Sequence, residues 1–380
     1  MSEQTLVLGI ESSCDETSCA VVADGRRVLS NVVASQIDLH ARFGGVVPEI
    51  ASRAHIEAVN TVFGEALAEA SVAPADIAAV AVTCQPGLIG SLLVGLMAAK
   101  TVAWVWDVPL IGVNHVYAHA YAAALNAECI EYPAAALICS GGHTALYRCQ
   151  SPMDMELLGT TIDDAAGEAF DKVASILRLG YPGGPAIDKA ARGGNPEAVR
   201  FPRSLLAGDC LDFSFSGIKT AVLYHVNGVP GARGAKPRGE AGEPGAPSPR
   251  HSRRRCGPAS QRLDSQPNAG RGIENFTPAE LADVAASFQA AVIDVLKIKL
   301  RRAARAVGAK TLILGGGVAA NSVLRAALEK LAAQLGCQLR MPELRFCMDN
   351  AAMIAGLGYH YLQAGKVDDL TLSAQATVRR

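Results

Sequence analysis

The sequence predicts an α/β protein made of two similar halves that face each other across a cleft. Short apolar runs typical of strands alternate along the chain with longer helical patterns, as in sheets that are covered by helices. Each half opens with the same motif, in which a short polar turn joins two strands. The 380 residues, of which 50% are hydrophobic and 19% charged, are enough for two or three domains with cores of their own.

The first half is predicted to begin with three strands and to continue with alternating helices and strands. Asp24-Gly25 joins the second strand to the third, because this dipeptide is typical of a hairpin turn. The expected strands are residues 5–10, 18–23, 26–33, 77–83 and 110–113, and the expected helices are residues 49–70, 90–106 and 115–125.

The second half is predicted to begin near Ala134 with a strand pair around the turn Ser140-Gly141-Gly142-His143. Further along, Thr277-Pro278-Ala279-Glu280 is a capping box with proline at the first helical position, so we expect a helix from there to Val307. The other expected elements are strands at residues 135–139, 144–149 and 311–314, a turn at residues 315–317, and helices at residues 322–335 and 350–362.

A segment rich in glycine, proline and arginine interrupts the second half at residues 228–272. It contains 16 glycines and prolines in 45 residues, with nine Lys or Arg against three Asp or Glu. Because such a composition cannot build a packed core, we expect a disordered basic insertion. The expected division of the chain is a first lobe of residues 1–132, completed by a C-terminal helix at about 349–380, and a second lobe of residues 133–227 and 273–348.

Composition excludes several classes of protein. The ten cysteines form no C-x-x-C pair, so a zinc ribbon, an iron–sulfur run and a thioredoxin-type redox site lack their ligand spacing, and reduced thiols are expected. The most apolar stretch, residues 88–106, is interrupted by polar residues and glycines, and the N-terminus lacks a basic and then apolar signal. We therefore expect neither secretion nor a membrane span. The net charge of −1 decides nothing about a nucleic-acid partner.

Two histidines suggest a metal site. His115 and His119 lie four residues apart in a predicted helix, so that both imidazoles project from one face. A third ligand must come from elsewhere, and Asp349, the expected N-cap of the helix at residues 350–362, is the candidate. Unrelated histidines and an ordinary capping aspartate explain the same residues, so this interpretation stays open here.

The polar turns and the acidic segments are the other candidates. Glycine turns direct backbone N–H groups at an anion, although ordinary tight turns are the commoner explanation of Gly-Gly. Acidic residues gather in residues 9–17 and 162–172. In the second segment Glu168 and Asp171 are compatible with a solvated helix face, yet the apolar Phe170 and Val173 share the same turn.

Seven motifs, taken in order, identify a family. They are Gly-Ile-Glu-Ser-Ser-Cys-Asp-Glu-Thr (9–17), Asn-His-Val-Tyr-Ala-His (114–119), Ser-Gly-Gly-His-Thr (140–144), Asp-Asp-Ala-Ala-Gly-Glu-Ala-Phe-Asp-Lys (163–172), Tyr-Pro-Gly-Gly-Pro (181–185), Phe-Ser-Phe-Ser-Gly-Ile-Lys-Thr (213–220) and Gly-Gly-Gly-Val-Ala-Ala-Asn (315–321). On these motifs the chain resembles the tRNA threonylcarbamoyladenosine transferase family, once described as O-sialoglycoprotein endopeptidases. The resemblance covers nearly everything outside residues 228–272. It implies the two-lobed fold of actin, sugar kinases and 70-kDa heat-shock chaperones, with duplicated ribonuclease-H-like lobes around a central cleft.

The resemblance also implies the roles of individual residues. His115, His119 and Asp349 match the ligands of one divalent metal ion, iron or zinc. A substrate-binding turn is matched by Ile138, Cys139, Ser140, Gly141 and Gly142, and the residues that hold the nucleoside of an adenylate are matched by Asp171, Gly184, Asp188 and Asn321. Asp15 and Glu16 match acidic residues of the first turn and are the catalytic candidates.

The implied reaction is the transfer of a threonylcarbamoyl group from threonylcarbamoyl-AMP to the exocyclic amine of the adenosine 3′ to the anticodon, in tRNAs that read codons beginning with A. The implied partners are tRNA, a paralogous two-lobed subunit, a small P-loop ATPase and an upstream threonylcarbamoyl-AMP synthase. The expected location is the cytoplasm, with no membrane association. Two alternatives are a metal-dependent protease, which would need a glutamate where Val116 follows His115, and a non-enzymatic nucleotide-binding scaffold of the same fold.

The chain departs from the family pattern in two places. Gln85-Pro86-Gly87-Leu88 stands where the family usually has Gly-Pro-Gly-Leu, which predicts less backbone freedom in that loop. The insertion at residues 228–272 stands near a short family connection, where it would form a basic arm.

Overall fold

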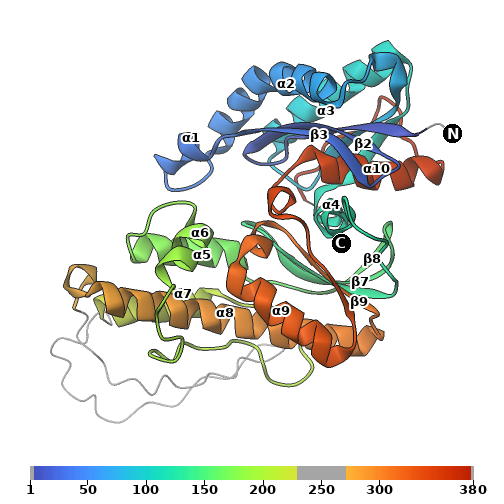
Figure 1. The fold of residues 1–380 in the computed structure, drawn as a ribbon. Helices are drawn as coiled ribbons and strands as arrows, with labels where there is room; N and C mark the ends of the chain where they lie inside the picture. Colours follow the sequence, from blue (N-terminus) through green and yellow to red (C-terminus); the bar gives the residue numbers. More distant parts are fainter. Residues whose placement is uncertain (1–3, 229–270, 378–380) are drawn as a thin grey trace, which may run out of the picture.

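The computed structural model describes residues 4–228 and 271–377, and its strands form two five-stranded mixed sheets (Figure 1). The strand order is β3-β2-β1-β4-β5 in the first sheet and β10-β9-β6-β7-β8 in the second. The strands are β1 (Leu6–Glu11), β2 (Glu16–Ala23), β3 (Arg27–Ser35), β4 (Ile77–Gln85), β5 (Leu110–Asn114), β6 (Ala134–Cys139), β7 (Thr144–Ser151), β8 (Asp154–Thr160), β9 (Thr311–Gly315) and β10 (Gln338–Arg340). The helices are α1 (Ile37–Ala41), α2 (Pro48–Ala70), α3 (Ile89–Trp106), α4 (His115–Tyr121), α5 (Ala166–Ile176), α6 (Gly183–Ala190), α7 (Ser216–Asn227), α8 (Pro278–Val307), α9 (Ser322–Leu335) and α10 (Ala351–Gln363).

The two sheets share one connectivity. In the first sheet, β1, β2 and β3 pair antiparallel, and β4 and β5 then add in parallel beside β1. In the second sheet, β6, β7 and β8 pair antiparallel, and β9 and β10 add in parallel beside β6. This repetition confirms the predicted α/β fold of two duplicated lobes. We call each sheet, together with the helices packed on it, a lobe.

Helices cover both faces of the first sheet, because its central strands are apolar on both sides. Leu8 and Ile10 of β1 pack in one cluster with side chains of α2 and α3. Val7, which points the opposite way, packs with side chains of α10. The first sheet therefore lies between the α2/α3 layer and α10 (Figure 1).

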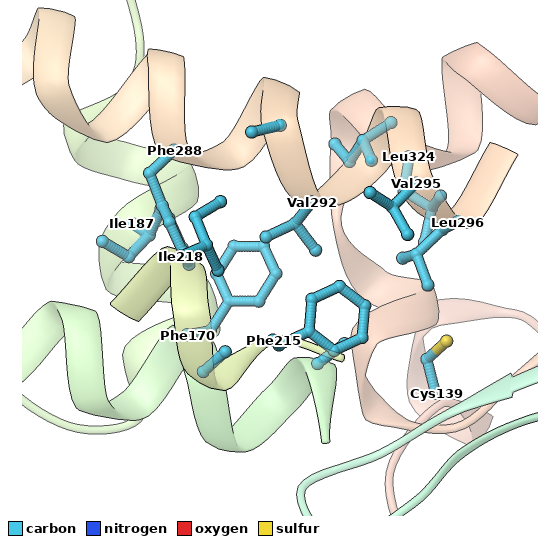
Figure 2. Close-up of a cluster of buried hydrophobic side chains, with 14 of the residues drawn as sticks. Cys139, Phe170, Ile187, Phe215, Ile218, Phe288, Val292, Val295, Leu296 and Leu324 are labelled. Carbon is cyan, nitrogen blue, oxygen red and sulfur yellow. The ribbon is translucent and has the colours of Figure 1, made fainter. Parts of the chain in front are cut away.

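The largest core lies on the far side of the second sheet, under α5 to α9. Leu137 of β6 belongs to this core, whereas its neighbour Ile138 packs on the other face with α4. Figure 2 shows part of the core, where Phe170 of α5 and Phe288 of α8 meet edge to face with ring centroids 5.2 Å apart. This core holds the helices whose N-termini border the candidate site.

Two helices cross between the sheets. α4 follows β5 of the first sheet and packs on β6 and β9 of the second, and α10 follows β10 of the second sheet and packs on β1, β2 and β4 of the first. The approach of α10 requires Gly9, because a Cβ there would collide with the carbonyl oxygen of Ala351. The first residues of both crossing helices therefore lie at the boundary between the lobes (Figure 1).

Several predicted elements differ from the observed ones. The helix expected at residues 115–125 ends as α4 at Tyr121 and continues as a 3-10 turn, Ala122–Ala124. The expected N-cap role of Asp349 is wrong, because α10 is capped by Asn350, whose side chain accepts a hydrogen bond from the Met353 N–H at 3.1 Å. The capping box of α8 is confirmed, since the Glu280 N–H donates to Thr277 Oγ1 at 3.2 Å.

α3 is the one helix in the described ranges that is long and apolar enough, by length and composition alone, to cross a membrane. It packs against β4 and α2, and 33% of its apolar window is buried. The exposed apolar side chains along it, which we call the α3 stripe, are Ile89, Leu93, Met97, Trp104 and Val105. The helix thus belongs to the first lobe and leaves an apolar face uncovered.

The predicted insertion lies outside the described residues except at its ends. Gly228 ends one described range, and Arg271 and Gly272 begin the next. The Gly272 N–H donates to the carbonyl oxygen of Val226 at 3.0 Å. The chain therefore leaves and re-enters the second lobe at neighbouring positions.

The cysteines agree with the expectation of reduced thiols at most positions. Eight of those in the described ranges are free, and five of the eight are buried. Cys210 is instead disulfide-bonded, which the spacing of the cysteines in the sequence did not predict.

Candidate functional site

The two histidines and the distant aspartate meet at the boundary between the lobes. His115 is the first residue of α4, His119 lies one turn later, and Asp349 lies just before the cap of α10. Asp349 Oδ1 is 3.0 Å from His119 Nε2 and 3.4 Å from His115 Nε2. Both imidazoles are buried, while the Asp349 side chain keeps 18% of its surface exposed. The structure thus brings together residues that are 230 positions apart in the chain.

The geometry of this trio fits a metal ion. Its ligand atoms all lie within 4.8 Å of one another, and ligands bonded at about 2.1 Å around a tetrahedral ion stand about 3.4 Å apart. Two imidazole nitrogens and a carboxylate are a donor set that zinc and ferrous iron accept. The trio is therefore a candidate site for either ion.

The electrostatics of the trio are those of a tightly coupled cluster. Burial alone would lower the pKa of His115, but the carboxylates of Asp349 and Glu11 raise it well above its ordinary value. Burial alone would raise the pKa of Asp349, but His115 and His119 hold it well below its ordinary value. A cation that binds here replaces a proton on His115, so its binding depends on pH.

The acidic turn of the first lobe, residues 12–16, joins β1 to β2. Glu16 is buried, and its Oε1 accepts a hydrogen bond from Ser35 Oγ at 2.9 Å. No described residue is bonded to its Oε2, and burial raises the pKa of Glu16 to about 8. Burial also raises the pKa of Asp15. Both predicted catalytic residues therefore hold protons more readily than exposed carboxylates.

A buried histidine holds this turn in place. His55 of α2 has its Nε2 3.0 Å from the carbonyl oxygen of Cys14 and its Nδ1 2.7 Å from Thr17 Oγ1. A carbonyl oxygen only accepts, so Nε2 carries the proton and Nδ1 accepts from the threonine. Burial lowers the pKa of His55, which keeps the ring neutral. Sequence reasoning missed this residue, whose pattern in α2 is that of an ordinary helix.

The loop that departs from the family pattern packs directly on the acidic turn. The Leu88 N–H donates to the carbonyl oxygen of Ser13 at 2.8 Å, and a Cβ at Gly87 would come within 2.6 Å of that oxygen. Gln85 is the last residue of β4, in an extended strand that any side chain tolerates. Glutamine in place of glycine at residue 85 therefore causes no backbone strain, because the strand conformation does not require glycine there.

The glycine turn of the second lobe, residues 140–143, joins β6 to β7 in the position that the acidic turn has in the first lobe. The described residues accept no hydrogen bond from the N–H groups of Gly141 and Gly142, and a Cβ at either would meet nothing within 4 Å. The N-terminus of α5 abuts the turn, because the absent Cβ of Gly167 lets Ser140 O approach to 2.5 Å of that position. Free N–H groups beside a helix N-terminus favour an anion.

Other residues of the predicted substrate turn contribute differently. Ile138 and Cys139 are fully buried strand residues, so only their backbone can reach a ligand. Burial and the neighbouring His115 and His119 lower the pKa of His143 to about 4, which places this neutral ring beside the trio.

The four predicted nucleoside residues lie where α5, α6 and the start of α9 meet. Asp171 Oδ1 accepts a hydrogen bond from the Gly183 N–H at 2.7 Å, and a Cβ at Gly184 would meet nothing within 4 Å. Asp188 accepts a hydrogen bond from Ser322 Oγ at 3.0 Å. Asn321 already caps α9 and donates to Gln289 Oε1 at 2.8 Å. The Asn321 side chain is thus already hydrogen-bonded to other residues through both its oxygen and its nitrogen.

The two lobes approach each other at these residues. Burial raises the pKa of Asp171, and the charge of Asp15 from the other lobe adds to that effect. Burial, Asp15 and Asp171 together raise the pKa of Tyr181 to about 12. Tyr181 therefore lies near predicted site residues of both lobes, although sequence reasoning gave it no role beyond its place in the Tyr-Pro-Gly-Gly-Pro motif.

Comparisons with known proteins agree on one family. The profile of the tRNA N6-adenosine threonylcarbamoyltransferase family matches residues 27–356. A protein of that name from Trichlorobacter lovleyi is 47% identical over 372 residues, which are 98% of this chain and 96% of the relative. Another of that name from Symbiobacterium thermophilum is 50% identical over 369 residues, which are 97% of this chain and 95% of the relative.

Solved structures support the fold alone. Full-length HypF, in a phosphate- and nucleotide-bound form, matches with a TM-score of 0.53 and 13% identity, over 100% of this chain and 48% of that one. HypF of T. kodakarensis matches with a TM-score of 0.54 and 14% identity, over 97% of this chain and 49% of that one. These likenesses agree with the two-lobed architecture.

Proposed function

The chain belongs to the tRNA N6-adenosine threonylcarbamoyltransferase family and is a transferase that acts on tRNA, and we propose that its donor is threonylcarbamoyl-AMP. The proposed acceptor is the exocyclic amine of the adenosine 3′ to the anticodon, in tRNAs that read codons beginning with A. The single observation that carries this proposal is the position of the His115, His119 and Asp349 trio, at the boundary where a glycine turn and an acidic turn occupy equivalent positions in the two lobes.

The second lobe holds the donor in this proposal. The N–H groups of Gly141 and Gly142 and the N-terminus of α5 face the anionic phosphate, to which they offer donors without a charged side chain. Asp171 and Asp188 accept hydrogen bonds from the ribose hydroxyls, and the open space at Gly184 lets the nucleoside come close to the backbone. Ile138 and Cys139 contribute through their backbone, and Asn321 supports the start of α9 beside the nucleoside.

One divalent ion, iron or zinc, is held by His115, His119 and Asp349. When bound, it supplies a Lewis acid that polarises the carbamoyl group and neutralises charge on the departing phosphate. The protein's own residues fix the position of the ion, because Nε2 of both histidines on α4 and Oδ1 of Asp349, just before α10, converge on one point. Three protein ligands leave further coordination positions for substrate.

The first lobe handles the proton in this proposal. The amine nitrogen forms a bond to the carbamoyl carbon, the bond from that carbon to the phosphate oxygen of AMP breaks, and the amine loses one proton. Asp15 and Glu16 lie on this side of the site with raised pKa values, which suits groups that accept that proton and release it near neutral pH. No covalent enzyme intermediate is needed.

Neither alternative function is supported. A metalloprotease needs a carboxylate that activates a water molecule, but the carboxylate nearest His115, that of Glu11, is fully buried and contacts the histidine's outer nitrogen. A scaffold without activity has no use for three ligands that converge from two distant segments of the chain. Membership of a transferase family agrees with both conclusions.

The substrate tRNA follows from the family, and the other partners are proposed. We expect a paralogous two-lobed subunit, a small P-loop ATPase and an upstream threonylcarbamoyl-AMP synthase, acting together in the cytoplasm without a membrane. The α3 stripe supports a protein partner, because exposed apolar side chains at helical spacing are the kind of surface that another helix covers.

Reconstitution tests the proposed function. Purified protein is combined with its partners, tRNA, threonine, bicarbonate and ATP, and the modified nucleoside is measured by mass spectrometry after digestion. We expect product from the parent protein and from His360→Ala, a control on α10 outside the trio, and none from His119→Ala. Lack of product from the parent with competent partners would refute the activity, and full product from His119→Ala would refute the role of the trio.

A further inference from the structure

Glu11 is a buried carboxylate that the proposed chemistry does not use. It is the last residue of β1, after the apolar run Leu6–Ile10, and none of its surface is exposed. A carboxylate at such a position is costly unless it is paired and hydrogen-bonded. Its partners therefore show what holds it there.

Both carboxylate oxygens of Glu11 have hydrogen-bond partners from other segments of the chain. Thr83 Oγ1 donates to Oε2 at 2.5 Å, and the Ser13 N–H donates to Oε1 at 2.5 Å. His115 Nδ1 lies 3.0 Å from Oε2 and 3.2 Å from Ser13 Oγ. Because donors from β4 and from the acidic turn hold both oxygens, the carboxylate has one position against the imidazole.

We propose that Glu11 is a positioning residue of the metal site, acting through His115. Its carboxylate accepts the Nδ1–H of His115, and it thereby turns Nε2 of the same ring toward His119 and Asp349. An acceptor on the outer nitrogen of a metal-binding histidine sets the ring's orientation and makes the inner nitrogen a stronger ligand. This inference rests on the metal site of the proposed function and adds a residue that does not touch the ion.

The placement of Glu11 excludes a role as a fourth ligand. Its Oε2 faces Nδ1 of His115, whereas Nε2 of that ring faces Asp349 Oδ1 at 3.4 Å. The imidazole ring therefore stands between Glu11 and the point where the three ligand atoms converge. Glu11 would therefore affect a bound ion only indirectly, through its hydrogen bond to the imidazole of His115.

The other histidine has no such partner. His119 Nδ1 is buried, and no described residue is hydrogen-bonded to it. The ring of His119 meets that of His115 edge to face, with centroids 4.5 Å apart. His119 is thus oriented by packing and His115 by Glu11, so the loss of the carboxylate affects one ligand specifically.

Glu11→Gln tests the proposal, because glutamine keeps the size of the side chain and removes its charge. Zinc is the probe, and its dissociation constant is measured by competition with a chromogenic chelator. We expect zinc affinity to fall about 10-fold to 100-fold, as for other outer partners of metal ligands. The nuclear magnetic resonance signal of the His115 Nδ1–H in zinc-loaded protein should shift, a change that a merely structural glutamate would not cause.

Two threonine substitutions provide a matched control. Thr83→Val removes the hydroxyl that donates to Glu11, and Thr311→Val removes an equally buried hydroxyl that donates to the carbonyl oxygen of Glu131 instead. We expect weaker zinc binding for Thr83→Val and parental binding for Thr311→Val. If Glu11→Gln does not fold, as judged by circular dichroism, the threonine pair carries the test.

The possible results of these zinc-binding measurements distinguish failure of the positioning role of Glu11 from failure of the proposed metal site. Parental zinc affinity in folded Glu11→Gln, or equal losses in the two threonine variants, would overturn the positioning role and leave the metal site standing. Failure of the parent itself to bind zinc or ferrous iron would overturn both.

Discussion

The two turns that join the first and second strands of each lobe occupy the same place in one connectivity, yet their chemistry is opposite. The acidic turn of the first lobe presents carboxylates whose pKa values are raised by burial. The glycine turn of the second lobe presents N–H groups, and neither Gly141 nor Gly142 has a described acceptor. A duplicated fold has therefore produced one turn suited to a proton and one suited to an anion.

This difference between the two turns indicates which substrate each lobe would face, the adenylate at the glycine turn and the amine at the acidic turn. An adenylate carries its negative charge on the phosphate, which free N–H groups attract and which a carboxylate of the acidic turn would repel once it has lost its proton. The amine that loses a proton needs the opposite environment. The trio of His115, His119 and Asp349 lies where the crossing helices begin, so that both ends of the reaction meet at one point.

The largest expected effect comes from Asp349→Ala, which removes the one ligand of the trio that lies outside α4, in the segment just before α10. The two histidines that remain are one ligand fewer than the three protein ligands that catalytic zinc sites use. We expect substoichiometric metal by mass spectrometry and loss of transferase activity, while His143→Ala, on the glycine turn, keeps its metal. Full metal content in Asp349→Ala would contradict the trio.

A smaller effect is expected from Asp171→Ala. Hydrogen bonds to a charged group contribute about 1.5 to 3 kcal/mol, so the affinity for the adenylate should fall about tenfold to a hundredfold, as measured by calorimetry. The melting temperature should change little, because the Asp171 carboxylate accepts its described hydrogen bond from the N–H of Gly183, the first residue of α6, and is not part of the apolar core. Asp154→Ala, on the edge strand β8, serves as the control. Equal affinity in both variants would remove Asp171 from the site.

The smallest effect concerns stability and Glu16. The pKa of Glu16 is about 8 in the folded protein against an ordinary value of 4.5, so the folded state binds the proton more tightly. This contribution to stability is present below about pH 4.5 and is lost as the pH rises through about 8. In urea unfolding between pH 5 and 9, Glu16→Gln should show a weaker decline than the parent. Parallel curves would contradict the raised pKa.

Local patterns were sufficient to predict much of the fold and part of the site. The capping box places the start of α8 at the residue where it is observed, because Thr277 and Glu280 satisfy each other's donors. The pair His115 and His119 could be predicted because four residues make about one helical turn. The two equivalent turns were visible as polar breaks between strand-like runs.

The rest depends on contacts between distant segments. β10 has three half-buried residues and β8 exposes much of its length, so neither carries a clear pattern. Asn350 rather than Asp349 caps α10, because its amide also donates to the carbonyl oxygens of Phe346 and Met348, which a carboxylate cannot do. Glu11 is visible as a charge after an apolar strand, but its partners on β4 and α4 are not.

Binding of AMP, the leaving group, tests the opposite polarity of the two turns most directly. Gly142→Asp places a carboxylate in open space on the glycine turn, and Asp15→Asn removes one from the acidic turn. Calorimetry should show much weaker AMP binding for Gly142→Asp, since like charges brought together cost several kcal/mol. For Asp15→Asn it should show AMP binding at least as tight as in the parent, although modified tRNA is no longer formed. Equal loss of AMP affinity in the two variants would contradict the account.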